Sequence, residues 1–333
     1  MKTNPRRLAL LSGVAAMVLA ASGMAGAVAM EASGPGVDTQ AVTAKMPGAP
    51  YLYLGWGDPQ SATSVMSETG VDAFTMAFML SSGGCNPAWD GSRPLTGGVD
   101  QSTINAIKGA GGQVQISFGG WSGNKLGPNC SSPEAFAGAV QQVINAHQPN
   151  VVDFDIENTD ELENYAVQDR ILRGIAIVKQ NNPSVQTVVT IPTSISGPAG
   201  AGARLITRAA ELGTPIDNYT IMTFDFGGSD MVADTISAAE GLKNQLRSAR
   251  GWSDAEAYAH SGISGMNGLS DVGETTTPGQ WTQIRDWASS HGLTRFAYWA
   301  VNRDRPCPGG GVTSNCSGIN QANLEFTRIT AGF

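Results

Sequence analysis

Short apolar runs alternate with amphipathic segments along the chain after residue 50. Apolar runs rich in β-branched and aromatic residues predict eight strands, over residues 51–56, 73–80, 113–118, 151–156, 186–191, 219–224, 262–266 and 295–301. Apolar residues at helical spacing predict helices over residues 136–146, 170–179, 204–212, 233–246, 280–288 and 323–329. Strands that alternate with helices indicate βα units and a parallel sheet. Eight such units in about 285 residues favour the α/β class and one closed (β/α)8 TIM barrel over residues 50–333.

The residues before this alternation resemble an export signal. A basic start precedes a short apolar run over residues 8–21, and a small-x-small cleavage pattern follows at residues 25–27. The apolar run is too short to span a bilayer comfortably. We therefore expect a signal peptide over residues 1–29 and a secreted, extracellular protein. Residues 30–49 are rich in Ala, Gly, Pro and Ser without periodicity, which predicts a flexible lead-in.

The composition narrows the range of partners. Of the 333 residues, 41% are hydrophobic, which is enough for a large core, and the net charge is −8. A negative surface argues against nucleic acid and anionic membrane as partners. We expect a monomer that uses no cofactor.

The four cysteines lie in the part of the chain expected to be exported, where disulfides form. Cys307 and Cys316 enclose a short glycine-rich loop, so we expect them to pair. Cys85 and Cys130 then pair by elimination, which is one of three possible connectivities. The cysteines show no C-x-x-C spacing and the three histidines lie far apart, so no metal site is expected.

Three acids end the fourth predicted strand at every second position: Asp153, Asp155 and Glu157. Side chains alternate across a strand, so Phe154 and Ile156 point the other way, toward the helices. The acids must then face the barrel interior and its mouth, where barrel enzymes keep their catalytic groups. Close carboxylates raise at least one pKa, as a general acid for glycosidic cleavage requires. A solvent-exposed acidic strand end or a cation site is the alternative, and the regular spacing favours catalysis with Glu157 as the acid.

This stretch resembles the D-x-D-x-E signature of glycoside hydrolase family 18, the chitinase family, and in particular a branch of secreted bacterial and archaeal chitinase domains. Residues 117–120 (S-F-G-G) resemble the family's S-x-G-G motif on strand three, and residues 222–225 (M-T-F-D) resemble its strand-six motif. Trp299 resembles the strand-eight tryptophan beneath the sugar. The similarity covers the whole chain after the leader.

The resemblance implies a secreted chitinase that hydrolyses β-1,4-linked N-acetylglucosamine in chitin or its oligosaccharides. Glu157 would protonate the glycosidic oxygen, and the substrate's own 2-acetamido carbonyl would attack the anomeric carbon, with retention of configuration. Asp155 would orient the acetamido group, and Asp153 would share a proton with Asp155.

The resemblance also implies a set of substrate-binding residues. Met222 would pack beside the acetamido methyl, Asp225 would be a polar contact near the sugar, and Trp299 would stack under the sugar in the −1 subsite. Further expected contacts are Trp121 as a platform for the +1 sugar, Gly119 and Gly120 as points of close backbone approach, and Trp56 as a lining of the cleft.

A departure from the family pattern on strand six bears on the alternatives. Many members have a tyrosine in the strand-six motif, whereas this chain has Phe224 and Phe226, which cannot donate a hydrogen bond. Losing such a donor can cost on the order of 10²-fold in rate. The alternatives are a non-catalytic chitin-binding lectin on the same barrel and an endo-β-N-acetylglucosaminidase. An esterase or protease is disfavoured because G-x-S-x-G is absent and no histidine lies beside a plausible nucleophile.

Overall fold

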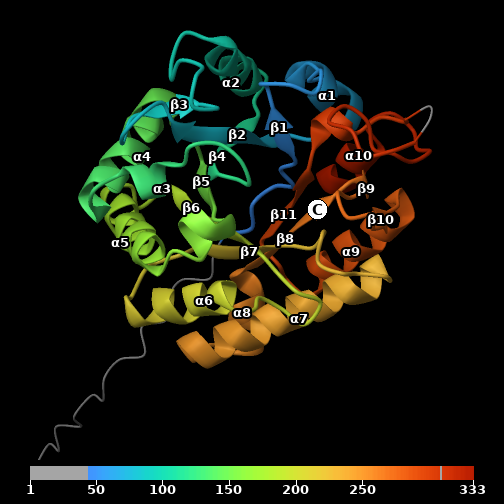
Figure 1. Cartoon of the computed structure of the whole chain (residues 1–333). Coiled ribbons are helices and arrows are strands. Elements are labelled where there is room, and N and C mark those ends of the chain that lie inside the picture. Colours follow the sequence, from blue (N-terminus) through green and yellow to red (C-terminus); the bar gives the residue numbers. More distant parts are fainter. Residues whose placement is uncertain (1–43, 308–309) are drawn as a thin grey trace, which may run out of the picture. The chain divides into compact units, whose positions relative to one another are not determined.

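Eight parallel strands form a (β/α)8 barrel in the computed structural model, which describes residues 44–307 and 310–333 (Figure 1). The predicted signal peptide and most of the predicted lead-in lie outside the described residues. The barrel strands, in their order around the sheet, are β1 (Tyr51–Tyr53), β2 (Ala73–Ser81), β4 (Gln113–Gly119), β5 (Val151–Asp155), β6 (Gln186–Pro192), β7 (Asn218–Met222), β8 (Ser261–Met266) and β11 (Arg295–Trp299). All eight predicted strands are therefore confirmed.

The residues just before β1 join it to β11. The backbone N–H of Met46 donates to the carbonyl of Thr294 at 2.9 Å, and that of Ala49 donates to Phe296 at 3.0 Å. Met46 and Ala49 are buried, and Met46 packs with Val151 and Val188. The boundary predicted at residue 50 is therefore wrong: an apolar methionine and paired backbone groups make at least residues 46–49 part of the barrel rather than a flexible lead-in.

Helices surround the barrel strands (Figure 1). The principal ones are α1 (Ala62–Thr69), α2 (Val99–Gly109), α4 (Pro133–His147), α5 (Tyr165–Asn181), α6 (Ala201–Glu211), α7 (Met231–Arg250), α9 (Pro278–Ser290) and α10 (Glu325–Ala331). Sequence periodicity predicts the last six of these. It misses α1 and α2 because their apolar stripes are short: α1 buries only Ala62 and Val65, and the apolar residues that α2 buries are Ile104 and Ile107.

The predicted alternation of side chains on β5 is confirmed. Phe154 points outward, with its ring centroid 5.5 Å from that of Phe118 and 5.9 Å from that of Phe136 on α4. Ile156 lines the same apolar layer, together with Ile171 of α5. Burying these side chains between the sheet and the helices leaves the acids of the strand no direction except the barrel interior.

Several short elements occupy the loops that follow the strands. They are β3 (Pro87–Trp89), α3 (Leu126–Asn129), the π-helical turn η1 (Asn158–Leu162), α8 (Asp254–Ala259), β9 (Gly268–Leu269), β10 (Thr275–Thr276) and η2 (Val301–Arg303). Some predicted strands run too far: β1 ends at Tyr53, three residues before its predicted end, and β7 ends at Met222 and β11 at Trp299, each two residues before its predicted end. The apolar pattern continues past these ends because the loop residues also pack into the barrel mouth.

Two disulfides link loops of the fold. Cys85 bonds to Cys130, and Cys307 bonds to Cys316, as the expected pairing requires. The first bridge ties the segment after β2 to the end of α3, which follows β4. The second closes a turn between η2 and α10. In the described residues no helix has the length and hydrophobicity needed to cross a membrane.

Candidate active site

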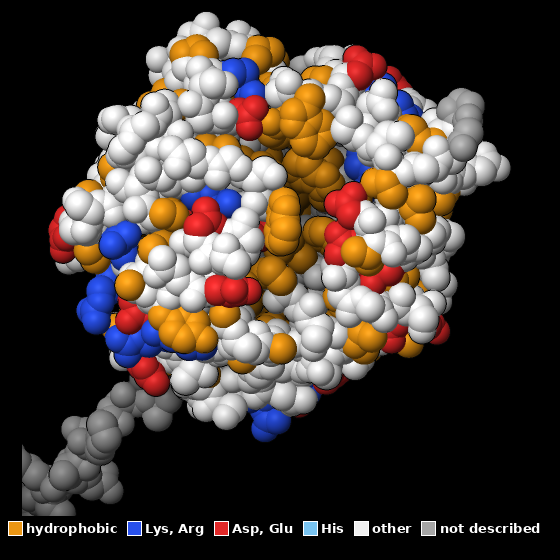
Figure 2. Space-filling model, in the orientation of Figure 1, with side chains coloured by type: hydrophobic (Ala, Val, Ile, Leu, Met, Phe, Trp, Pro, Cys, Tyr) orange, Lys and Arg blue, Asp and Glu red, His pale blue; other side chains and the backbone are white. Residues whose placement is uncertain are grey.

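The predicted acids lie at the carboxyl end of β5. Asp153 and Asp155 belong to the strand, and Glu157 follows two residues later as the residue that precedes η1. Figure 2 shows a hollow across the middle of the molecule, with hydrophobic side chains at its floor and acidic side chains along its margins. We call Asp153, Asp155 and Glu157 the acid ladder. Because two of these acids lie within the strand and the third lies beyond its end, they range from wholly buried to partly accessible.

Asp153 is the deepest of the three acids and is surrounded by donors. Its Oδ2 accepts hydrogen bonds from the hydroxyls of Tyr51 and Ser117, both at 2.8 Å, and its Oδ1 accepts one from Thr190 at 2.6 Å. The guanidinium of Arg295 lies 3.4 Å away. These donors give both carboxyl oxygens hydrogen-bond partners in a place that excludes water. The predicted sharing of a proton with Asp155 stays a prediction.

Asp155 is also buried, but it is poorly supplied with donors. Its Oδ1 has no hydrogen-bond partner among the described residues. Burial raises the pKa of Asp155 well above its usual range, and the nearby charges of Glu157 and Asp153 raise it further. Asp155 is therefore a carboxyl group that holds a proton readily.

Glu157 lies half-buried at the mouth. Burial raises the pKa of Glu157 to about 7, the charge of Lys125 lowers it, and the charge of Asp225 raises it. A carboxyl with this pKa is protonated in mildly acidic water and can release its proton to a bound group. This is the property required of a general acid.

Lys125 and Glu161 lie behind Glu157, and sequence reasoning missed both. The Lys125 side chain is buried, and its Nζ donates to the carbonyl of Trp121 at 3.1 Å and pairs with Asp160 at 3.4 Å. Burial raises the pKa of Glu161 to about 8, against the lowering effect of Lys125. The signal for Glu161 was its position four residues after Glu157, but η1 is a π-helical turn, which the sequence pattern does not reveal.

The glycines after β4 allow the backbone to approach β5. Gly119 has a φ of +102°, and a Cβ there would lie 2.2 Å from the carbonyl oxygen of Asp155. Gly120 donates its N–H to that same carbonyl at 2.9 Å. Trp121, 68% exposed, follows directly, and its carbonyl accepts a bond from the Asn158 side chain at 2.5 Å. The close approach expected of this pair of glycines is thus present, and it places the exposed indole beside the segment that follows Glu157.

An aromatic cluster centres on Trp299 at the end of β11. Its ring stacks on Phe78, with centroids 5.6 Å apart and planes 15° apart. Tyr51, Tyr53 and Trp56 contact it at 5.9 to 6.0 Å. Tyr51 also binds Asp153, so this cluster adjoins the acid ladder. The arrangement offers apolar rings beside carboxyl groups, which suits a sugar with C–H faces and polar edges.

The segment after β7 is shaped by a residue that the sequence did not single out. The Glu274 carboxylate, between β9 and β10, accepts four backbone N–H bonds from residues 225–228, at 2.6 to 3.1 Å. In return, Asp225 Oδ1 accepts the N–H of Val272 at 3.1 Å. Met222 is buried at the end of β7. Asp225 thus accepts a hydrogen bond from the β9–β10 hairpin. Its charge also raises the pKa of Glu157.

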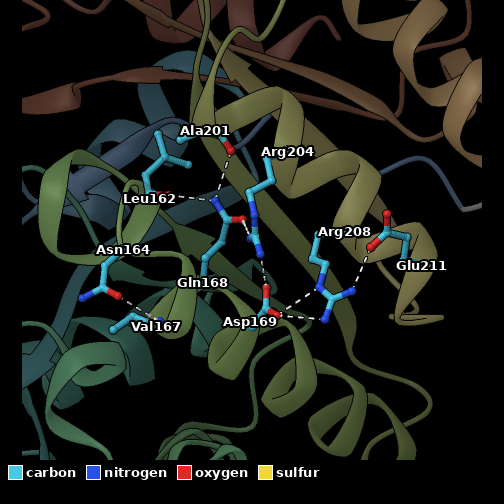
Figure 3. A network of polar contacts seen from close by, with 9 residues as sticks. All are labelled: Leu162, Asn164, Val167, Gln168, Asp169, Ala201, Arg204, Arg208 and Glu211. Carbon is cyan, nitrogen blue, oxygen red and sulfur yellow. Dashed lines mark hydrogen bonds and ion pairs between the residues drawn. The ribbon is translucent and has the colours of Figure 1, made fainter.

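A polar network holds the far end of η1 (Figure 3). The Gln168 side chain of α5 donates to the carbonyls of Leu162 at 2.8 Å and Ala201 at 3.0 Å. Its amide oxygen accepts from Arg204 of α6, which also pairs with Asp169 at 2.8 Å. The turn that begins beside Glu157 is therefore anchored to two helices of the outer layer.

No group of three metal-binding side chains occurs among residues 44–307 and 310–333. The site can transfer a proton from Glu157 to a bound group. A second carboxyl that holds a proton readily, that of Asp155, and the aromatic cluster around Trp299 lie close by. The fold and these acids define the class of barrel glycosidases.

Comparison with known proteins narrows this class. No protein-family model matches the chain. The "Probable bifunctional chitinase/lysozyme" of Escherichia coli K12 is 25% identical over 306 residues, which are 86% of this chain and 34% of that protein. "Endochitinase 11" of Metarhizium anisopliae is 24% identical over 78% of this chain and 52% of that protein. The chain thus spans between about a third and about half the length of these relatives.

Solved structures agree with the sequence relatives. The catalytic domain of a hyperthermophilic chitinase from Pyrococcus furiosus superposes with a TM-score of 0.78 and 28% identity, over 87% of this chain and 96% of that domain. Catalytic-site mutants of a chitinase domain from the same organism have been solved with chito-oligosaccharides. A GH18 chitinase from Pseudoalteromonas aurantia shares the fold, with a TM-score of 0.55 and 14% identity over 76% of this chain and 93% of that one. The described barrel is therefore a chitinase-like domain, similar in sequence and fold to chitinases, including structures of glycoside hydrolase family 18.

Proposed function

We propose that this protein is a chitinase that hydrolyses β-1,4 linkages between N-acetylglucosamine units by a retaining, substrate-assisted mechanism. The observation that carries the proposal is the set of three acids on β5, in which a buried carboxyl of raised pKa lies below Glu157, whose pKa is about 7. The 28% identity to the Pyrococcus furiosus chitinase domain supports chitin as the substrate class.

In the proposed reaction Glu157 gives its proton to the glycosidic oxygen. The bond from that oxygen to the anomeric carbon breaks, and the carbonyl oxygen of the substrate's acetamido group bonds to the same carbon. Asp155 holds the acetamido N–H and offsets the positive charge that develops on the ring so formed. Glu157, now a carboxylate, takes a proton from water, which attacks the anomeric carbon from the side of the departed group while the bond from the acetamido oxygen to that carbon breaks and the acetamido group is restored. Two displacements on one carbon retain its configuration.

The protein is further proposed to act outside the cell, as a monomer. Two features support secretion: the basic, apolar and small-residue pattern of residues 1–29, and the pairing of all four cysteines. Disulfides persist in oxidising compartments and are rare where thiols are kept reduced.

Glu157→Gln tests the acid. The amide keeps the shape of the side chain but cannot protonate a leaving group, so kcat on chito-oligosaccharides should fall at least roughly 10²-fold, with the fold unchanged by circular dichroism. Glu163→Gln is the matched control, because Glu163 is exposed and lies six residues further along. Near-normal turnover by Glu157→Gln would remove Glu157 from the mechanism.

The substrate's own acetamido group is tested by comparing N-acetylglucosamine oligomers with glucosamine oligomers of the same length. The deacetylated sugar has no carbonyl oxygen to form the ring intermediate, so its hydrolysis should be at least roughly 10²-fold slower. Comparable rates on both sugars would contradict the substrate-assisted route.

The lectin alternative rests on Phe224 and Phe226, which stand where the family pattern often has a hydroxyl. Both are half-buried, and Phe226 belongs to the segment whose backbone N–H groups Glu274 binds. A product assay on chitin and its oligomers decides between the two functions. An enzyme releases shorter N-acetylglucosamine oligomers, whereas a lectin binds the oligomers and leaves their length unchanged.

A further inference from the structure

Tyr165 is an exposed aromatic residue at the first position of α5. Its exposed fraction is 51%, although its ring is large and apolar. Residues 156–164 lead from the end of β5 through η1 to the start of α5, so Tyr165 lies at the face of the barrel where the acid ladder ends. Single exposed apolar side chains are common on protein surfaces, so exposure alone assigns Tyr165 no role.

The ring of Tyr165 is held on one side by a cation. The guanidinium of Arg204, in the first turn of α6, lies over the ring, with its central carbon 4.3 Å from the ring centroid. The negative face of an aromatic ring attracts a cation in this position. Because Arg204 covers one face of the ring, the exposure of Tyr165 belongs mainly to the opposite face and the edge.

Arg204 is itself fixed by the polar network of α5 and α6 (Figure 3). Its Nη1 donates to the side-chain oxygen of Gln168, and its Nη2 pairs with Asp169 at 2.8 Å. Arg208 binds the other carboxylate oxygen of Asp169 at 2.9 Å. The guanidinium that supports Tyr165 is thus anchored to both helices. A ring that is already held in place loses little conformational freedom when it binds a ligand.

The turn η1, which begins directly after the general acid, has an exposed aromatic residue tied to each of its ends. At its start, Asn158 donates to the carbonyl of Trp121 at 2.5 Å. At its end, the carbonyl of Leu162 accepts from Gln168, which lies one turn after Tyr165 on α5. Trp121 and Tyr165 are both more than half exposed. Two exposed rings fixed to one turn suit an extended ligand that presents several apolar faces.

We infer that Tyr165 stacks against an N-acetylglucosamine unit of the chitin chain that lies away from the bond being cleaved. This inference extends the proposed function and rests on it for the identity of the polymer. A β-1,4-linked sugar presents C–H bonds on its faces, and these fit the electron-rich face of an aromatic ring. An uncharged sugar also fits better than a cationic ligand, because Arg204 on the other face of the ring would repel a second positive charge.

The consequence is a preference for long chains, because only these reach Tyr165 from the acid ladder. In Tyr165→Ala, kcat/KM on the N-acetylglucosamine hexamer should fall roughly 3- to 10-fold, the range expected for one aromatic contact. The nitrophenyl glycoside of the N-acetylglucosamine dimer occupies only the positions next to the cleaved bond, so its kcat/KM should not change. Tyr165→Phe keeps the ring and should keep the native rate on the hexamer.

Val99→Ala is the matched control. Val99 is likewise the first residue of a helix, α2, and is 53% exposed, but α2 follows a different strand. Its replacement should leave both substrates unaffected. An unchanged rate of Tyr165→Ala on the hexamer would overturn the inference. Equal losses on the hexamer and the dimer glycoside, or an equal loss in Tyr165→Phe or Val99→Ala, would also overturn it, because damage to the fold or loss of the hydroxyl would then be the cause.

A second measurement does not depend on hydrolysis. The hexamer is titrated by calorimetry into Glu157→Gln and into the double variant Glu157→Gln/Tyr165→Ala, and the Kd should be roughly 3- to 10-fold higher for the double variant. Equal affinities would refute the inference. A native protein that hydrolyses neither substrate, together with this difference in hexamer affinity, would instead contradict the proposed hydrolysis and leave the role of Tyr165 standing.

Discussion

Lys125 shows how one buried cation sets the working range of the acid. Its ammonium lies between the Trp121 carbonyl and Asp160, and its charge favours the carboxylate forms of Glu157 and Glu161. Burial of the two glutamates acts in the opposite direction and is the larger effect. The pKa of about 7 for Glu157 is therefore the outcome of desolvation moderated by Lys125.

This balance predicts the alkaline limb of activity. The acid must be protonated to react, so kcat/KM should fall as pH rises through about 7. Lys125→Met removes the charge that favours ionisation, so the pKa of Glu157 rises and the alkaline limb should move to higher pH, by on the order of one unit. The measurement is the pH profile of chito-oligosaccharide hydrolysis.

Lys108→Met is the control for Lys125. Lys108 also donates to two backbone carbonyls, those of His147 and Gln148, but it lies away from the ladder. Its loss should leave the alkaline limb in place. If Lys125→Met changed KM but left the alkaline limb of the pH profile in place, the role of Lys125 would be confined to holding the Trp121 segment.

At the scale of elements, the β9–β10 hairpin and the segment after β7 brace each other. Glu274 binds the four N–H groups of residues 225–228, and Asp225 binds the N–H of Val272. Hydrogen bonds to a charged acceptor contribute roughly 1.5–3 kcal/mol each. The brace gives a loop without regular structure a defined course past Glu157.

Glu274→Gln should loosen this brace. The amide NH₂ would face backbone donors, so the segment must shift, and kcat/KM should fall roughly 10- to 100-fold because Asp225 and its neighbours are misplaced. Steady-state kinetics on chito-oligosaccharides provide the readout.

Glu256→Gln supplies the comparison, since Glu256 likewise accepts a backbone N–H, that of Ser253, at 2.8 Å in the capping box of α8. It should lower stability slightly and leave kcat/KM unchanged. Equal effects of the two changes on kcat/KM would assign Glu274 a general role in stability.

At the scale of the whole molecule, the two disulfides differ in how much chain they constrain. Cys85–Cys130 spans a sequence separation of 45 residues, and Cys307–Cys316 spans 9. In the chain-entropy account a cross-link stabilises by restricting the unfolded state, and longer loops are restricted more. The long bridge also joins loops that follow two adjacent barrel strands, β2 and β4.

Replacing both cysteines of one bridge with serine, in two separate variants, tests whether the longer loop contributes more stability. The Cys85/Cys130 variant should lose roughly 4 kcal/mol of unfolding free energy and the Cys307/Cys316 variant roughly 2.6 kcal/mol. Urea unfolding of the two variants and the native protein measures the order. A greater loss from the short bridge would mean that native-state contacts, rather than chain entropy, dominate.

Much of the fold follows from local patterns. Eight strand runs and six helical stripes predict the barrel, because burial on one face leaves a period in the sequence. The same logic places Phe154 outward and the acids inward on β5. It fails for α1 and α2, whose stripes are too short, and at residues 46–49, where burial depends on contacts with β11 that no local pattern contains.

The sequence by itself determined the barrel, the alternation on β5 and the identity of the three acids, since these depend on periods of two and 3.6 residues within single segments. Only the tertiary structure decided which charges act on those acids. Arg295 lies 142 positions from Asp153, whereas Lys125 lies 35 positions from Asp160 and Glu274 lies 46 to 49 positions from residues 225–228. Burial and long-range electrostatic contacts set the protonation state of a carboxyl, and closure of the barrel alone brings those contacts together.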